Sequence, residues 1–124
     1  SCIPESDGGI RMPASLKVAK YAKDRVIQNQ SKGSEYKNLV KGLGAMIIQN
    51  GLLATLLFLK SKDKPHHKAV MEDIFEFMKL RGIPNPQNMQ YDESRYLRLT
   101  SEVLEMNKWL RRYADILIES KDRA

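Results

Sequence analysis

The chain has 124 residues, of which 42% are hydrophobic and 29% are charged, and its formal net charge is +6. This length and composition are typical of one globular domain that buries a core of its own. Cys2 is the only cysteine, which excludes an intrachain disulfide and a cysteine-based zinc site. The N-terminus has no basic region followed by an apolar run, so we expect no signal peptide and a cytoplasmic protein.

The excess positive charge lies in the first half of the chain. Residues 14–64 hold ten basic and three acidic side chains, a net charge of +7, whereas residues 65–124 hold ten of each. A basic half is typical of a protein that meets a polyanion, either nucleic acid or an anionic membrane. A soluble protein with a lysine-rich face has the same pattern, and charge alone does not separate the two.

The first predicted helix follows an N-terminal arm. Residues 1–13 contain two prolines and two adjacent glycines without hydrophobic periodicity, and residues 14–124 are predicted as a single helical domain. The helix is predicted over residues 14–30, with Pro13 in its first turn. Its predicted buried stripe contains Leu16, Ala19, Ala22 or Lys23, Val26 and Ile27.

The basic residues of this helix differ in their local partners. Lys20 and Asp24 are four residues apart and form an i,i+4 ion pair. Lys17, Lys23 and Arg25 have no partner at such a spacing.

The second helix is predicted to begin after an N-cap at Ser34 and to reach about Asn50. Lys37 and Lys41 are like charges four residues apart, which costs a few tenths of a kcal/mol unless an anion offsets it. Gly42 and Gly44 are unfavourable inside a helix. Close helix–helix packing explains them, and close approach to a phosphate or a partner is the alternative.

The centre of the chain is an uncharged stretch over residues 42–59. It is nearly long enough for a membrane span, but the amides of Gln49 and Asn50 in its middle exclude a lipid-facing helix. We predict a pair of buried helices with a break at Asn50-Gly51, where glycine ends one helix and asparagine caps the next. One continuous helix is the alternative. Apolar residues nearly all round predict burial nearly all round.

The fourth helix is predicted from Pro65 to about Arg81, after a basic loop over residues 60–64. Its buried side is predicted to contain Met71, Ile74, Phe75, Phe77, Met78 and Leu80. His66-His67 is the only histidine cluster, and adjacent histidines on a helix point about 100° apart, so we expect no metal site.

The fifth helix follows an extended loop at residues 82–87 and is predicted from an Asp92 N-cap to about Ser120. Its main stripe is predicted to contain Tyr96, Leu99, Val103, Met106, Leu110, Tyr113 and Leu117. Predicted i,i+4 ion pairs are Arg98–Glu102 and Arg111–Asp115. Core packing is the default role of Trp109, and base stacking is the alternative.

The predicted fold is an all-α compact bundle of about five or six helices, with residues 36–59 at its centre. The sequence contains no Ser–His–Asp order and no glycine-rich phosphate loop, so we expect neither an enzyme nor a cofactor.

Two blocks of sequence together resemble a known family. The first leads from Tyr36-Lys37-Asn38-Leu39-Val40 through Asn50-Gly51-Leu52 to Phe58-Leu59-Lys60, and the second runs from Tyr96-Leu97-Arg98-Leu99-Thr100 to Trp109-Leu110-Arg111-Arg112-Tyr113-Ala114. With the leading helix SLKVAKYAKDRV, they resemble the small subunit of the Cmr complex, the type III-B CRISPR effector. The resemblance covers most of residues 14–120.

The resemblance implies an all-helical, non-catalytic subunit of a ribonucleoprotein. Such subunits stack with further copies of themselves and contact the repeated backbone subunit and the large subunit, near guide RNA and target RNA. A free-standing basic nucleic-acid-binding regulator and the related small subunit of the Csm complex are the alternatives. A DNA-binding regulator needs a polar recognition helix after a tight turn, and LLATLLFL after Asn50-Gly51 is too apolar to read bases.

The candidate nucleic-acid-binding residues are basic and lie mostly on the first two helices. They are Lys17, Lys20, Lys23, Arg25, Lys37, Lys41, Arg111 and Arg112. We expect contacts to phosphate rather than to base edges, because a subunit that serves many guides must ignore sequence.

Overall fold

The computed structural model describes residues 14–82 and 93–119, which form five α-helices and one short 3-10 helix. The elements are α1 (Ala14–Gln28), η1 (Gln30–Lys32), α2 (Gly33–Asn50), α3 (Leu52–Lys62), α4 (Pro65–Leu80) and α5 (Glu93–Leu117). No strand occurs in these two ranges, and the predicted all-helical fold is confirmed. The predicted arm, most of the loop at 82–87 and the predicted Asp92 cap lie outside the described residues.

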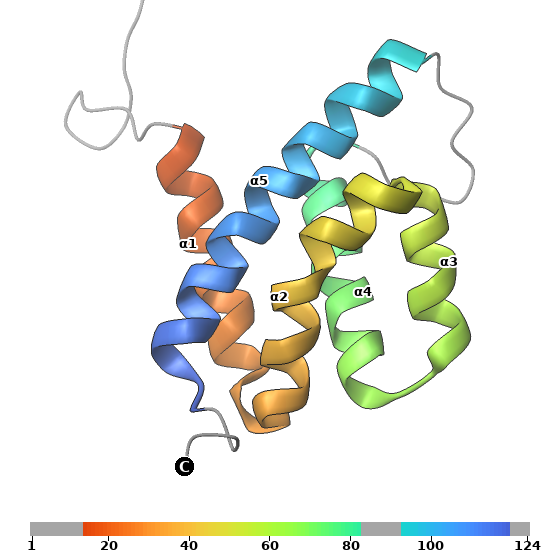
Figure 1. Cartoon of the computed structure of the whole chain (residues 1–124). Coiled ribbons are helices and arrows are strands. Elements are labelled where there is room, and N and C mark those ends of the chain that lie inside the picture. The colour runs from red at the N-terminus through yellow and green to blue at the C-terminus, as the bar shows by residue number, and fades with distance from the viewer. Residues whose placement is uncertain (1–13, 83–92, 120–124) are drawn as a thin grey trace, which may run out of the picture.

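Helix α2 lies at the centre of the arrangement, between α5 on one side and α4 and α3 on the other (Figure 1). The most extensive helix–helix contact is between α1 and α5. Gln30 Nε2 donates to the carbonyl of Leu117 at 2.9 Å, so the C-terminal ends of α1 and α5 meet and the two helices run in the same direction. Helix α5 packs on both α1 and α2, and α4 packs on both α2 and α3.

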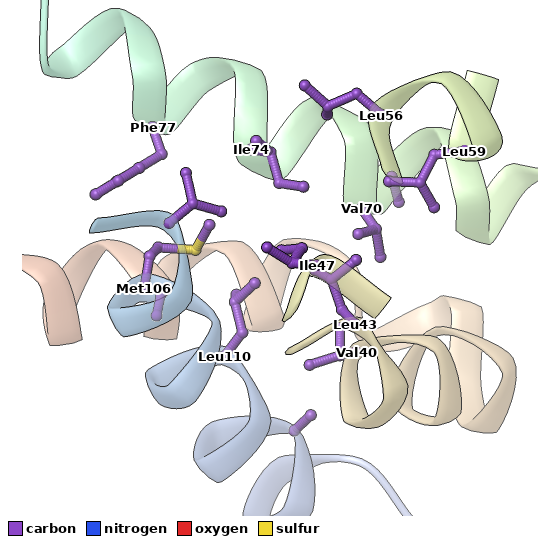
Figure 2. Packing of buried hydrophobic residues seen from close by; sticks show 14 of the residues in the cluster. Val40, Leu43, Ile47, Leu56, Leu59, Val70, Ile74, Phe77, Met106 and Leu110 are labelled. Carbon is purple, nitrogen blue, oxygen red and sulfur yellow. The ribbon is translucent and has the colours of Figure 1, made fainter. Parts of the chain in front are cut away.

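The hydrophobic core joins all five α-helices, and Figure 2 shows part of it. Its labelled members are Val40, Leu43, Ile47, Leu56, Leu59, Val70, Ile74, Phe77, Met106 and Leu110. The predicted burial of Leu43, Ile47 and Leu56 is confirmed. Trp109 packs against this core but is only partly buried.

The predicted break after Asn50 is confirmed, but the cap is not the predicted one. Gly51 has φ 89°, a conformation that favours glycine, and it separates α2 from α3. No side chain of the local sequence caps α3. Instead the Leu53 N–H donates to the Tyr96 hydroxyl on α5 at 3.1 Å. A side chain distant in sequence thus satisfies one of the free donors at the start of this helix.

Helix α2 begins slightly earlier in the sequence than predicted. The helix begins at Gly33, with Lys32 in the N-cap position, so Ser34 is inside the helix and does not cap it. Gly33 has φ 66°, which lets the chain leave η1 and turn into α2.

The uncharged stretch is predicted to be buried nearly all round, and this prediction is wrong. Seven large apolar side chains that the sequence patterns placed in or beside the core are exposed instead. They are Leu16, Ile27, Ile48, Leu53, Leu57, Leu80 and Leu97. The reason is geometric, because these side chains lie on the sides of their helices that no neighbouring helix covers.

The two glycines of α2 differ in their surroundings. A Cβ at Gly44 would lie 3.3 Å from Asn107 Nδ2, so the predicted role in helix packing is confirmed there. A Cβ at Gly42 would meet no described atom within 4 Å, and packing within this chain does not explain it. None of the described helices combines the length and the apolar character that crossing a membrane requires.

Candidate functional site

Helix α1 presents a basic side to solvent. Lys17, Lys20 and Lys23 are all exposed, and successive members lie three residues apart, so they span about 120° of the helix circumference. The opposite side is buried through Ala19, Ala22 and Val26. We call Lys17, Lys20 and Lys23 the α1 lysine face.

The α1 lysine face has little internal compensation. The predicted Lys20–Asp24 pair is confirmed, with Nζ 3.7 Å from Oδ2 and both side chains mostly exposed. Neither Lys17 nor Lys23 has an ion-pair partner in the part of the chain that the structure describes. This face is therefore open to an external anion.

Arg25 lies on the same helix but points inwards. Its Nε donates to Asp73 Oδ1 on α4 at 2.7 Å, and its side chain is only 13% exposed. A second nitrogen lies 3.5 Å from the Glu72 carboxylate. Burial alone would lower the pKa of the Arg25 guanidinium, but the hydrogen bond and the charge of Asp73 outweigh it and raise the pKa. The guanidinium is thus held in a fixed ion pair within the chain.

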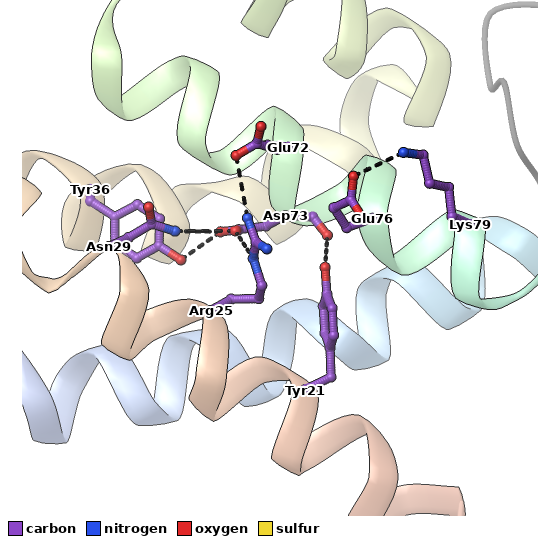
Figure 3. Close-up of polar contacts among 8 residues, drawn as sticks. All are labelled: Tyr21, Arg25, Asn29, Tyr36, Glu72, Asp73, Glu76 and Lys79. Carbon is purple, nitrogen blue, oxygen red and sulfur yellow. Dashed lines mark hydrogen bonds and ion pairs between the residues drawn. The ribbon is translucent and has the colours of Figure 1, made fainter.

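Arg25 belongs to a polar cluster around Asp73 that joins α1, α2 and α4 (Figure 3). Asp73 is completely buried and accepts from Asn29 Nδ2 at 3.1 Å and from the Tyr36 hydroxyl at 2.6 Å. Its main-chain carbonyl accepts from the Tyr21 hydroxyl at 2.5 Å. We call these five residues the Asp73 cluster.

The Asp73 cluster is shielded from substrates by its burial. Burial raises the pKa of the Asp73 carboxyl, while hydrogen bonds from Tyr36 and Arg25 oppose the shift. Burial and the nearby Asp73 charge also raise the pKa of Tyr36, which keeps the phenol protonated as a donor. The sequence patterns did not predict this cluster. A signal was present, because Asp73 stands alone as an acid within the apolar stripe of α4.

Lys37 and Lys41 are not the uncompensated pair that the sequence predicted. Lys37 is 9% exposed and donates to the Ile118 carbonyl at 2.9 Å. The ammonium groups of Lys37 and Lys41 each lie 4.0 Å from Asp115 Oδ1. One carboxylate of α5 therefore offsets both charges, and Lys37 ties the start of α2 to the end of α5.

The predicted ion pairs within α5 are replaced by pairs between helices. Glu102 forms an ion pair with Arg81 Nε at 2.7 Å instead of with Arg98. Asp115 pairs with Lys37 and Lys41 of α2 instead of with Arg111. Both carboxylates link α5 to other parts of the bundle, which helical spacing alone does not reveal.

The arginine pair of α5 is exposed at the surface. Arg111 has no ion-pair partner within the two described ranges, and the Arg112 guanidinium lies 5.6 Å from the centre of the Trp109 ring. Trp109 and Tyr113 stack with ring centres 6.4 Å apart. The predicted site residues therefore divide into six that are accessible (Lys17, Lys20, Lys23, Lys41, Arg111 and Arg112) and two, Arg25 and Lys37, that are bonded within the chain.

The histidine pair at the start of α4 shows no arrangement for a metal. The His66 and His67 ring centres are 4.3 Å apart, and His66 Nδ1 lies 3.9 Å from Glu35. Burial and the neighbouring His66 lower the pKa of His67. The described residues contain no cluster of three or more His, Cys, Asp or Glu side chains that could hold a metal ion.

The comparisons with known proteins all identify the same family. A model of the family of CRISPR-associated protein (Cas_Cmr5) matches residues 14–117, which span every described helix. The chain is 37% identical over 112 residues to CRISPR system Cmr subunit Cmr5 of Thermotoga maritima, covering 87% of each protein. It is 32% identical over 101 residues to the subunit of the same name from Thermus thermophilus, covering 80% of this chain and 89% of that protein.

The fold is similar to a solved structure as well. The crystal structure of a CRISPR-associated Cmr5 family protein from Thermus thermophilus matches with a TM-score of 0.73 at 30% identity, covering 88% of this chain and 100% of that chain.

Proposed function

This chain belongs to the Cmr5 family of CRISPR-associated proteins and is a Cmr complex subunit in CRISPR defence, and from this premise we propose its specific role. It is a non-catalytic small subunit of a type III-B ribonucleoprotein. It stacks with further copies of itself along the inner filament, contacts the repeated backbone subunit and the large subunit, and helps to hold target RNA against the guide.

The α1 lysine face is the observation that supports the RNA contact. Its three ammonium groups are exposed and meet one carboxylate, that of Asp24. Lysines arranged in this way neutralise phosphates without reading bases. Lys41, Arg111 and Arg112 are accessible and extend the proposed contact surface to α2 and α5.

We assign Arg25 and Lys37 an indirect role in the same function. Arg25 is bound to the buried Asp73, and Lys37 to the Ile118 carbonyl, so contact with RNA requires breaking these bonds. Each fixes the position of a helix that carries accessible basic residues. Their substitution therefore acts through the fold.

The burial of Asp73 supports the non-catalytic role. Asp73, whose pKa is raised by burial, is completely buried and accepts hydrogen bonds from Arg25, Asn29 and Tyr36. General acid–base chemistry needs such a group within hydrogen-bond reach of a substrate. We expect the purified chain to cleave neither RNA nor nucleotides. Metal-dependent cleavage that a point substitution in this chain abolishes would contradict that expectation.

The test of the RNA contact is target-RNA binding by reconstituted complex across a salt series. The variant is Lys17→Gln/Lys20→Gln/Lys23→Gln, which removes three charges and keeps the side-chain lengths. Each lost phosphate contact flattens the log–log salt slope by roughly 0.7 to 0.9. We expect weaker binding and a flatter slope than for the wild type.

The matched control is Lys68→Gln/Lys79→Gln/Lys108→Gln. It removes the same charge from three exposed lysines, each of which pairs with a nearby carboxylate on the chain. An equal loss of affinity in both variants would mean that net charge acts without a defined site. Unchanged affinity in the α1 variant would reject the RNA contact. Loss of assembly in the absence of RNA would assign the face to a protein partner.

A further inference from the structure

A shallow groove lies between the second half of α2 and the outer side of α3. It has a volume of about 390 Å³ and is lined by Met46, Asn50, Ala54, Thr55 and Phe58. We call it the α2–α3 groove. Thr55 is buried, and its hydroxyl donates to the Gly51 carbonyl at 2.8 Å, so it needs no further partner from a ligand. The groove thus offers apolar walls and a satisfied polar group.

The residues that line the groove all belong to the uncharged stretch 42–59, which is predicted to be buried, yet several of them are exposed. Phe58 is 36% exposed, and Ala54 and Asn50 are also at the surface. Residues 42–59 contain no charge, whereas the chain as a whole is 29% charged. Apolar side chains that line an exposed groove are candidates for a contact with another macromolecule.

Lys62 brings positive charge to the Phe58 end of the groove. Lys62 Nζ lies 5.2 Å from the centre of the Phe58 ring, which itself lines the groove. Lys60, Lys62 and Lys64 are exposed and have no ion-pair partner within the residues described. The one acid among them, Asp63, binds Lys68 at 3.1 Å. An apolar channel with an unpaired basic end is complementary to an apolar segment with acidic side chains.

We infer that the α2–α3 groove is the docking site for an acidic amphipathic helix of a partner protein. An apolar side chain of that helix fills the space between Met46 and Phe58, and its carboxylates meet Lys62 and Lys64. Helix-in-groove recognition uses this combination of apolar anchors and charged flanks. The inference rests on the proposed function in one respect, that the partner is a different subunit of the Cmr complex.

The distribution of charge disfavours RNA as the occupant. A nucleic-acid backbone carries a phosphate at every nucleotide and needs cations along its path. The groove has none along Met46, Asn50 and Ala54, and its lysines lie beyond Phe58.

A second copy of this chain is also a poor match for the groove. The described helices hold most of their exposed and half-exposed carboxylates in ion pairs of their own. These pairs are Lys20–Asp24, Arg25–Glu72, Lys68–Asp63, Lys79–Glu76, Arg81–Glu102 and Lys108–Glu105, together with the contacts of Lys37 and Lys41 to Asp115. Few acids therefore remain on a second copy for Lys62 and Lys64, and docking would have to break existing pairs.

The first test identifies the occupant by photo-cross-linking in the reconstituted complex. Phe58→p-benzoylphenylalanine places the reactive group at the groove and keeps an aromatic ring there. Lys79→p-benzoylphenylalanine is the control on an exposed position of α4. We expect position 58 to cross-link to an apolar segment flanked by acids in a different subunit, and position 79 to give no cross-link to that segment. A cross-link from position 58 to RNA or to a second copy, or no cross-link, would overturn the inference.

The second test measures the contribution of the groove to assembly. Ala54→Trp fills the groove from an exposed position, and Lys62→Glu/Lys64→Glu reverses the charge at its end. In competition with wild type for incorporation, read by native mass spectrometry, each variant should lose at least about ten-fold, as for removal of one anchor contact. Lys79→Glu/Lys108→Glu is the control and should compete equally with wild type. Circular dichroism verifies that all variants are folded.

The outcomes separate this inference from the proposed function. Failure of the wild type to enter the complex would refute the proposed function. Incorporation of the wild type together with equal incorporation of both groove variants would refute the docking site and leave the proposed function intact.

Discussion

Lys23 and Arg25 are two residues apart on α1, yet they have opposite roles in the structure. Lys23 is exposed and has no ion-pair partner within the described ranges, whereas Arg25 is 13% exposed and bound to the buried Asp73. Lys41 and Lys37 on α2 differ in exposure in the same way, although both ammonium groups lie 4.0 Å from Asp115 Oδ1. The net charge of a sequence therefore overstates the charge that a polyanion meets, because part of it holds the fold together.

A similar difference between inward and outward side chains occurs among the apolar residues of α3. Leu56 is 5% exposed and packs in the core, whereas its neighbour Leu57 is 56% exposed. One side of the helix stabilises the bundle, and the other is available to a partner. The contrast between inward residues and their outward neighbours can be tested by substitution.

The largest expected effect follows from removing the inward arginine. Arg25→Ala leaves Asp73 buried without its cation, and breaking a buried ion pair in this way costs about 3–5 kcal/mol of unfolding free energy. Urea denaturation measures the loss. Lys23→Ala, on the same helix, is the control and should change stability little. Equal effects of the two substitutions would mean that the ion pair is not formed in solution.

The next effect is a cavity in the core. Leu56→Ala removes a buried side chain beside α4 and should cost about 2–5 kcal/mol. Leu57→Ala deletes the same atoms from an exposed position and should cost far less. A Leu56→Ala loss below about 1 kcal/mol would show that this side of α3 is not in the core.

A smaller effect concerns pH. Burial raises the pKa of Asp73 in the folded chain, whereas the unfolded value is about 3.9. A group with a raised folded-state pKa contributes its full stability below the unfolded pKa and loses it as pH rises through the folded value. We expect the stability of wild type relative to Asp73→Asn to be greatest near about pH 4 and to fall towards neutral pH.

Urea denaturation of both proteins between about pH 4 and 7 measures this pH dependence. A wild-type advantage that grows with pH would indicate that the charge of Arg25 dominates over burial at Asp73.

The smallest expected effect is on the α1 lysine face. Exposed positions without tertiary contacts tolerate substitution within about 0.5 kcal/mol. Lys17→Gln and Lys20→Gln should therefore leave the thermal midpoint nearly unchanged while RNA binding by the complex weakens. A large fall in the midpoint would show that these lysines support the fold.

The sequence by itself determined the helices and the break between α2 and α3. Hydrophobic periodicity, Pro65 at the start of α4 and Gly51 at a positive φ are local signals, because helix geometry and glycine's freedom act within a few residues. The resemblance to the Cmr small subunit, confirmed by the family match, depended on two such blocks read together.

Only the tertiary structure decided which side of each helix faces inwards and which charges are free. Asp73 and Arg25 form an ion pair although they are 48 residues apart, and Asp115 pairs with α2 instead of its own helix. Spacing along the chain therefore does not predict these pairs. Burial depends on how many neighbours the packed bundle supplies, and α3 at the edge has too few to cover Leu57 and Phe58. The physical reason is that periodicity specifies an apolar side chain's direction around its own helix, while its exposure is set by the helices that pack against that direction.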